Sequence, residues 1–188
     1  MIYIVDNFLS KELLDEFLND KSDFIEHRYP DKSFWVKMPS EKFNQYVINE
    51  IEKIEGKKIK NILSFFREAK ENQDDDWRIH NDSIINNDYP NRAIVLFMES
   101  EDSDNLNGTA FWEHKKFGQT YQEEKNAKNF NKILSEESEN IDAWTLKSVI
   151  GYKQNRLLSY PCEYFHSKYP KEFKQSRKVF VMFYKIEQ

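Results

Sequence analysis

Two histidines, one aspartate and one arginine are the residues in this chain whose types and spacing could do chemistry. His80 and Asp82 are separated by a single residue, whereas His166 and Arg177 follow much later. Two imidazole nitrogens and one carboxylate can occupy one face of an octahedron around Fe(II) and leave the other positions open for reaction. The planar guanidinium of Arg177 can bind a carboxylate at two points, a task for which lysine is a poor substitute.

The charges of this set indicate what it would bind. Fe(II) with one aspartate carries one net positive charge, and Arg177 adds a second. A dianionic keto acid would neutralise both, and without such a ligand the buried charge would be costly. The site therefore favours a small dicarboxylate.

Strand geometry supports the pairing of the first two residues. Alternate side chains of a strand point to the same face, so His80 and Asp82 can converge while Asn81 points elsewhere. His166 follows an apolar strand that ends at Pro161, and a β-barrel would return this strand end to the first pair. Plainer interpretations stay open, because a His-x-Asp pair is common by chance and Arg177 could form a surface ion pair.

Composition limits the class of protein. The 188 residues fit one domain, which we expect to span 1–188. The net charge of −5 is spread along the chain with no basic stripe, so nucleic acid is not a favoured partner. The single cysteine, Cys162, indicates a reducing compartment, and the N-terminus shows neither a signal peptide nor a membrane span. We therefore expect a soluble, cytoplasmic protein.

The periodicity predicts a mainly β fold with flanking helices. Residues 1–56 are predicted to form a flank with a strand at Ile2–Val5 and two helices, one capped by Ser10 and one from about Ser40 with Gly56 just past its end. Residues 57–188 are predicted to form the β-barrel, with a polar insertion near 115–140. The predicted strands are a period-two run from Ile59 to Arg67, an extended segment over Trp77–Asp82, and strands at Arg92–Met98, Gly108–Trp112, Trp144–Tyr152, Leu157–Tyr160 and Lys178–Tyr184.

These residues, in this order, resemble a known family. His-x-Asp, a distal His, an Arg shortly after it and an intervening Gly-Thr are similar to the 2-oxoglutarate- and Fe(II)-dependent dioxygenases, especially small prolyl-hydroxylase-like members. The opening Ile2–Ser10 also resembles their first strand and helix start. The resemblance covers most of the chain, from Ile2 to Tyr184, except the polar segment Thr120–Ser138.

The resemblance implies a fold, a cofactor set and a reaction. The implied fold is a double-stranded β-helix, a cupin-like jelly-roll barrel with the N-terminal helices packed on one sheet. His80, Asp82 and His166 would hold Fe(II), and Arg177 would bind the distal carboxylate of 2-oxoglutarate. Members of the family use O2 to decarboxylate the keto acid to succinate, and they usually hydroxylate an unactivated C–H bond.

The chain departs from the family pattern at two places. Asn107-Gly108-Thr109 replaces a frequent double glycine before the threonine, and Val179 stands where many relatives place Ser or Thr. A second hydrogen bond to the keto acid must then come from elsewhere. The candidate hydroxyl groups belong to Ser64, Tyr89 and Tyr160.

Several other residues are weaker candidates for a role at the site. His114 could be an alternative ligand, but Lys115 and Lys116 would repel a cation, so we interpret it as a surface or rim histidine. Trp112 and Arg67 are expected inside or at the mouth of the barrel, where they could touch a substrate or be packed or ion-paired. His27, in the flank, is interpreted as structural, and Cys162 as a buried, inert thiol.

Two other function classes remain open beside the dioxygenase. One is a metal-binding, cupin-like domain that performs no oxidation, and the other is a vestigial jelly roll that serves as an interaction module. The substrate, whether a protein side chain, a free amino acid or a metabolite, would be selected by loops around the barrel mouth, notably Ser83–Asn91 and His114–Ser138. Loop sequences do not reveal such a target.

Overall fold

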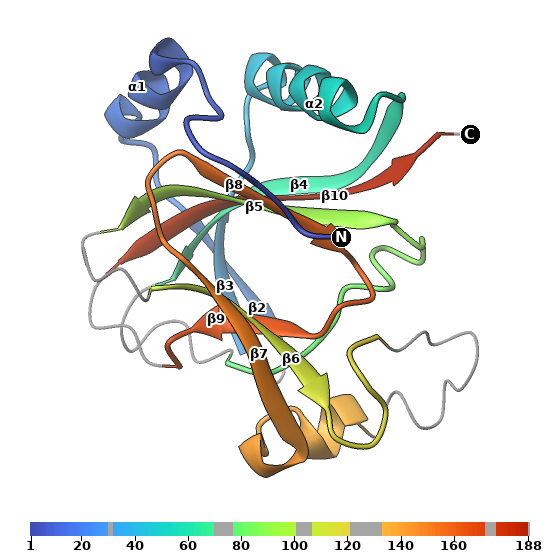
Figure 1. Cartoon of the computed structure of the whole chain (residues 1–188). Coiled ribbons are helices and arrows are strands. Elements are labelled where there is room, and N and C mark those ends of the chain that lie inside the picture. The colour runs from blue at the N-terminus through green and yellow to red at the C-terminus, as the bar shows by residue number, and fades with distance from the viewer. Residues whose placement is uncertain (30–31, 70–76, 101–106, 121–132, 172–175, 188) are drawn as a thin grey trace.

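The computed structural model contains two antiparallel sheets that face each other, with two helices on the outer side of the larger sheet (Figure 1). The structure describes all residues except 30–31, 70–76, 101–106, 121–132, 172–175 and 188. The fold is mainly β with few helices, as the sequence predicts. Among the described residues, no helix is long and apolar enough to pass through a lipid bilayer.

The larger sheet has seven strands in the order β1-β8-β5-β10-β4-β3-β2. Their bounds are Tyr3–Val5 (β1), Ile25–Tyr29 (β2), Lys32–Lys37 (β3), Ile59–Ala69 (β4), Arg92–Ser100 (β5), Arg156–Pro161 (β8) and Arg177–Ile186 (β10). The smaller sheet has the order β7-β6-β9, formed by Gly108–His114 (β6), Trp144–Gly151 (β7) and His166–Tyr169 (β9). Two short helical turns, η1 (Ile133–Glu137) and η2 (Ile141–Ala143), precede β7.

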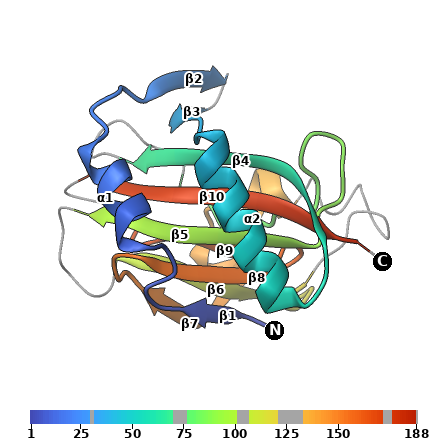
Figure 2. The same cartoon turned by 90° about the horizontal axis from the view of Figure 1, so that it is seen from above.

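The two helices begin at the residues that the sequence predicts. The Ser10 side chain accepts a hydrogen bond from the Leu13 backbone at the start of α1 (Lys11–Asn19), and Ser40 caps α2 (Glu41–Glu55) in the same way. α2 ends at Gly56, whose φ of 66° is a left-handed conformation that glycine adopts at little cost. Seen from above, both helices lie across the larger sheet (Figure 2).

The apolar side chains of the helices form one core with the outer face of this sheet. Phe17 of α1 and Phe43 of α2 meet Phe66 and Phe180 of the central strands, with ring centroids 4.7–5.3 Å apart. All four side chains are buried. Burial of each aromatic ring contributes roughly 1.5–3 kcal/mol to folding, so this cluster fixes the helices on the sheet.

Strand β5 shows why the central strands are apolar throughout. Ile94, Leu96 and Met98 face the helices, while Ala93, Val95 and Phe97 face the smaller sheet. A strand covered on both faces has no reason to alternate between apolar and polar residues. The predicted strand at Arg92–Met98 is therefore confirmed, and both of its faces are buried.

Strand β4 departs from the predicted pattern because of a bulge. The sequence predicts that Ile59, Leu63 and Arg67 share one face, but Ile59 packs with the helices whereas Leu63 belongs to the inner cluster. The register with β10 shifts between Leu63 and Asn61, so one extra residue, Ile62, reverses the alternation. Beyond the bulge, the side chains of β4 that point into the space between the sheets include those of Leu63, Phe65 and Arg67.

A hairpin extends the larger sheet beyond β4, and the sequence analysis missed it. β2 and β3 pair with each other, and Trp35, Val36 and Lys37 of β3 pair with β4. The flank of residues 1–56 is therefore not only strand β1 and two helices, because it also supplies two strands of the main sheet. Of the predicted polar insertion, residues 121–132 lie outside the described residues.

Candidate metal and dicarboxylate site

A single pair of backbone hydrogen bonds brings the two histidines together. The His80 N–H donates to the His166 carbonyl at 3.0 Å, and the His166 N–H donates to the His80 carbonyl at 2.8 Å. Residues paired in this way stand directly opposite each other on one face of an antiparallel ladder. The two imidazole rings accordingly lie with their centroids 4.5 Å apart.

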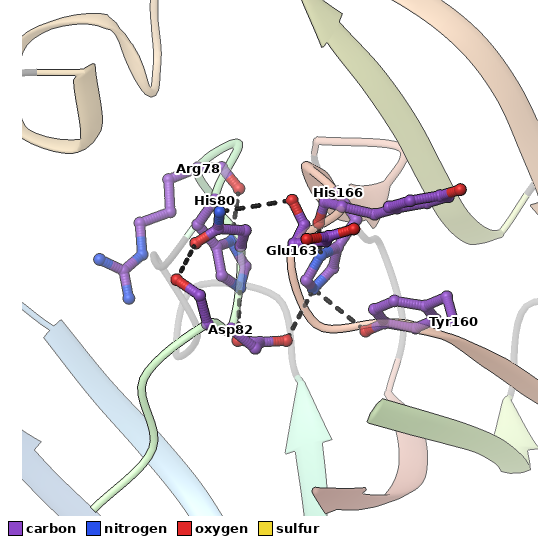
Figure 3. A network of polar contacts seen from close by, with 9 residues as sticks. Arg78, His80, Asp82, Tyr160, Glu163 and His166 are labelled. Atoms are coloured by element: carbon purple, nitrogen blue, oxygen red, sulfur yellow. Dashed lines mark hydrogen bonds and ion pairs between the residues drawn. The ribbon is translucent and has the colours of Figure 1, made fainter. Parts of the chain in front are cut away.

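Asp82 lies beside the two histidines because the extended segment that contains His80 continues along the same edge of the smaller sheet. Its backbone N–H donates to the Cys162 carbonyl at 2.9 Å, which holds the segment beside the chain leading into β9. Alternate residues share a face, so the Asp82 carboxylate points to the side of the two rings. One nitrogen from each histidine and one oxygen from Asp82 lie within 4.8 Å of one another (Figure 3).

Backbone carbonyls fix which ring nitrogen of each histidine faces the aspartate. Nδ1 of His80 lies 3.1 Å from the Arg78 carbonyl, and Nδ1 of His166 lies 3.0 Å from the Tyr164 carbonyl. A carbonyl can only accept, so in the neutral imidazoles the proton is on Nδ1 and the lone pair is on Nε2. This is the arrangement that orients histidines as metal ligands.

The geometry of the three side chains requires a positive charge between them. Nε2 of His166 lies 3.2 Å from one oxygen of Asp82, and Nε2 of His80 lies 3.8 Å from the other. Lone pairs on these nitrogens would repel the carboxylate unless a proton or a metal cation stood between them. Burial raises the pKa of Asp82, but the charges of His166, His80 and Arg78 outweigh this effect, so its pKa lies below the ordinary value. Asp82 is therefore an anion, and the donor set fits a divalent metal.

Arg177 lies on the larger sheet, across the interior from this group. It is the first residue of β10 and is 5% exposed. Its Nη1 donates to the Gly108 carbonyl at 2.8 Å, and its guanidinium carbon lies 5.2 Å from the centre of the Phe97 ring. The hydrogen bond and the cation–π contact hold the charge in place inside the molecule.

One cavity of about 810 Å³ connects all four residues. Its walls come from both sheets, from the β2–β3 hairpin and from Ser83–Ile85, and they are mostly apolar. Thr109 of β6, which is buried beside Gly108, also lines it. The size is within the range of sites that hold small molecules, about 300–1,000 Å³. The cavity can therefore hold a dicarboxylate and part of a second compound.

Of the three candidate hydroxyl groups, only one lies on the cavity wall. Ser64 faces the helices and donates to the Asn44 side chain at 2.9 Å, and Tyr89 is 48% exposed, so neither lies on the cavity wall. Tyr160 does line the cavity, with its hydroxyl 3.1 Å from Nε2 of His166. Burial, with the charge of Asp82, raises the pKa of Tyr160 well above its ordinary value, so it is a neutral phenol.

The expectation for His114 was wrong. It is 3% exposed rather than at the surface, and its Nε2 lies 2.7 Å from a Glu137 carboxylate oxygen. Its Nδ1 accepts hydrogen bonds from the backbone of Lys116 and Phe117. Both ring nitrogens are thus occupied in a structural role, away from the three donors.

Trp112 also lies elsewhere than the sequence predicts. It packs on the outer face of the smaller sheet, in a cluster with Trp77 and Trp144, and its indole donates to Ser167. It does not line the cavity, because Phe111, its neighbour in β6, is the residue that points inward. The register of β6 with β7 shifts at this point, but the extra residue, Lys147, is on β7, so the alternation along β6 is unbroken.

The remaining weaker candidates do reach the cavity or its border. Arg67 lines the wall with its guanidinium carbon 4.5 Å from the centre of the Phe34 ring. His27 lies on strand β2 of the hairpin and borders the cavity, so it is not confined to a separate flank. Cys162 is buried, and burial together with the charge of Asp82 raises its pKa well above the usual value, as expected for an inert thiol.

Comparison with known proteins shows likeness in structure only. No protein-family model matches the chain, and no curated protein matches its sequence. HygX from Streptomyces hygroscopicus, solved with nickel, 2-oxoglutarate and hygromycin B, superposes with a TM-score of 0.60 at 9% identity, over 98% of this chain and 82% of HygX. The non-heme α-ketoglutarate-dependent epimerase SnoN of nogalamycin biosynthesis gives 0.64 at 8% identity, over 98% and 78%.

A third similar structure is the collagen prolyl hydroxylase of Paramecium Bursaria Chlorella virus-1 in its 2-oxoglutarate complex. Its TM-score is 0.53 at 11% identity, over 97% of this chain and 94% of the hydroxylase. The chain has the fold of 2-oxoglutarate-dependent oxygenases. The resemblance seen in the sequence is thereby confirmed for the fold.

Proposed function

We propose that this protein is a 2-oxoglutarate- and Fe(II)-dependent dioxygenase that hydroxylates a substrate within the cavity. The observation that carries the proposal is the placement of His80, Asp82, His166 and Arg177 on the walls of one cavity. Nε2 of both histidines faces the carboxylate. In this proposal the two facing sheets form the double-stranded β-helix of the family.

Each residue has a role that follows from its surroundings. His80, Asp82 and His166 would hold Fe(II), because their donor atoms lie together and the carbonyls of Arg78 and Tyr164 keep the histidine lone pairs turned inward. Arg177 would bind the distal carboxylate of 2-oxoglutarate. When bound, iron and the keto acid supply the oxidation: O2 converts 2-oxoglutarate to succinate and CO2, and its second oxygen atom enters a C–H bond of the substrate.

The chain itself would position the keto acid and keep water away from it. The hydrogen bond to Gly108 directs the Arg177 guanidinium, and the Thr109 hydroxyl beside it would supply the second hydrogen bond that Val179 cannot give. The buried apolar side chains of Val95 and Val179 line the same cavity. In such surroundings the attraction between a guanidinium and a carboxylate is stronger than in water.

The primary substrate would enter between the β2–β3 hairpin and Ser83–Ile85. Phe34 and Val36 of the hairpin line the cavity, as do two strongly exposed apolar residues, Ile25 and Met38. This wall would bind an apolar part of a metabolite or a protein side chain. A reducing cytoplasm would keep both the iron and Cys162 in their reduced states.

The test is the formation of succinate from 2-oxoglutarate by the purified protein with Fe(II) and O2. We expect turnover even without a substrate, and faster turnover when a suitable acceptor is present. His80→Ala, Asp82→Ala and His166→Ala should each lower it more than about 100-fold, because even the loss of a group that only orients a ligand costs about 10- to 100-fold. Mn(II) binding, followed by electron paramagnetic resonance, should be lost in parallel.

His27→Ala is the matched control, since this exposed histidine borders the cavity but lies outside the donor group. It should retain both Mn(II) binding and turnover. Metal binding without any affinity for 2-oxoglutarate would instead support a non-oxidative cupin-like domain, and the absence of metal binding would support an interaction module. Because SnoN is an epimerase, the product should also be checked for the gain of an oxygen atom.

A further inference from the structure

Tyr160 is the buried polar side chain nearest to the proposed metal position that the proposed function leaves without a role. It lies on the inner face of β8 and is 1% exposed. Its ring packs edge-on against Phe111, with centroids 5.2 Å apart, and lies 4.8 Å from the ring of His166. The aromatic contacts on both sides fix the direction of its hydroxyl group.

The Tyr160 hydroxyl forms a hydrogen bond with the nitrogen through which His166 would bind the metal. The hydroxyl oxygen lies 3.1 Å from Nε2 of His166, and this is its only hydrogen bond within the described part of the chain (Figure 3). Nδ1 of His166 carries the proton that is donated to Tyr164. When the imidazole is neutral, the phenol donates to Nε2; when Nε2 carries a proton shared with Asp82, the phenol oxygen accepts.

This hydrogen bond and a metal exclude each other. A nitrogen that coordinates a metal has neither a free lone pair nor a proton for a hydrogen bond, so Tyr160 must release His166 when the ion binds. A buried hydroxyl hydrogen without an acceptor is costly. The new acceptor must lie within a short distance of Nε2, where Asp82 already serves as a ligand. No described residue other than His166 forms a hydrogen bond with this hydroxyl, so the acceptors that the loaded site adds are the oxygen ligands that complete the coordination of the ion.

We propose that Tyr160 is a positioning residue that exchanges one hydrogen-bond partner for another during loading of the site. In the metal-free protein it holds the His166 ring in place. In the loaded protein it donates to the oxygen by which water, and then the keto-acid end of 2-oxoglutarate, binds the ion. This role rests on the proposed function and assigns Tyr160 to the metal end of the ligand, opposite to the Arg177 end.

The test compares two ligands that share one end. 2-Oxobutyrate keeps the keto-acid end of 2-oxoglutarate and lacks the distal carboxylate. Tyr160→Phe should weaken the binding of both compounds to the Mn(II)-loaded protein by the same factor, about tenfold, as expected for one hydrogen bond to a charged oxygen. Arg177→Gln should weaken 2-oxoglutarate only. Dissociation constants from calorimetry or tryptophan fluorescence measure both effects.

The Mn(II) affinity of Tyr160→Phe should change little, because the variant loses one hydrogen bond in both the metal-free and the water-ligated states. The matched control is Tyr184→Phe, which removes an equally buried hydroxyl that binds Glu55 at 2.6 Å on the opposite face of the sheet. It should lower stability and leave both ligand constants unchanged.

Each outcome decides the proposal. Unchanged constants in Tyr160→Phe would reduce Tyr160 to a packing residue, and a loss confined to 2-oxoglutarate would place it at the Arg177 end; either result overturns the role. If the unsubstituted protein failed to bind Mn(II), the proposed function would fall and this role with it. If the unsubstituted protein binds Mn(II) and 2-oxoglutarate normally, a failure of the Tyr160 role is distinguished from a failure of the proposed function.

Discussion

At the scale of single residues, the site depends on hydrogen bonds that orient side chains rather than on the side chains alone. The carbonyls of Arg78 and Tyr164 decide that Nε2 of each histidine faces Asp82. Nothing in the types of Arg78 and Tyr164 signals this role, because it is their backbone that acts. Substitution of these two positions should therefore disturb the site less than substitution of the residues whose side chains it uses.

Arg177→Lys tests whether the shape of the cation matters in addition to its charge. Lysine keeps the charge but lacks the planar group that donates to the Gly108 carbonyl and to a carboxylate at the same time. We expect the KM for 2-oxoglutarate to rise about tenfold with little change in kcat. Loss of one hydrogen bond to a charged group weakens binding by about this factor. Initial rates of succinate formation measure this.

Arg177→Gln is the companion variant, since it keeps hydrogen-bond donors and removes the charge. It should raise the KM further than Arg177→Lys does. An equal KM in both variants would show that the charge of Arg177 is not used in binding.

The spacing of His80 and Asp82 was informative in the sequence because a strand puts alternate residues on one face. The partner across the ladder was predictable only in outline: His166 was chosen as a residue after a strand end, and the bridge to His80 supplies the register. Ser64, Trp112 and His114 show the limit of such reasoning. Whether each side chain faces the cavity depends on packing or on a bulge, and neither can be predicted from the residue type.

At the scale of elements, the β2–β3 hairpin is the main feature that the sequence analysis missed. Phe34 and Val36 alternate with Ser33 and Trp35, a period-two signal typical of a strand. The run is short and stands between two clear helices, so the flank looked helical. By contrast, Ser10 and Ser40 were sufficient to predict where the helices begin, and Gly56 where α2 ends.

The close approach of β6 and β7 at Gly108 supports Arg177, and Gly108→Ala tests this dependence. A Cβ atom at this position would lie 1.9 Å from the Ile150 carbonyl oxygen, so the two strands would have to separate. The carbonyl that accepts from Arg177 would move with them. We expect a loss of about 1–3 kcal/mol in the free energy of unfolding, together with weaker binding of 2-oxoglutarate.

Denaturant unfolding and calorimetry measure the two effects of Gly108→Ala. The control is Gly118→Ala, where an added Cβ would meet no atom within 4 Å and only the positive φ of 84° would cost energy. Gly118→Ala should lower stability slightly and leave the binding of the keto acid unchanged. Equal effects of the two variants on binding would separate Gly108 from the site.

At the scale of the whole molecule, the proposed site joins the two sheets. The proposed metal ligands lie on β9 and on the segment that pairs with its edge, whereas Arg177 and Tyr160 lie on the larger sheet. A 2-oxoglutarate molecule bound to both groups would span the interior and connect the sheets. Loss of the ligand should therefore affect the stability of the whole fold and not only the local segment.

This arrangement predicts a stepwise thermal stabilisation. A ligand at about 100 times its dissociation constant stabilises the folded state by about 2.7 kcal/mol, which for a domain of this size corresponds to a rise in Tm of about 5–10 °C. Mn(II) should raise Tm by itself, and 2-oxoglutarate should add a further rise only when Mn(II) is present, because one of its ends needs the metal. His166→Ala should show neither step. A full rise with 2-oxoglutarate in the absence of metal would mean that the keto acid binds through Arg177 and its neighbours alone, and the connection between the sheets would then have to be abandoned.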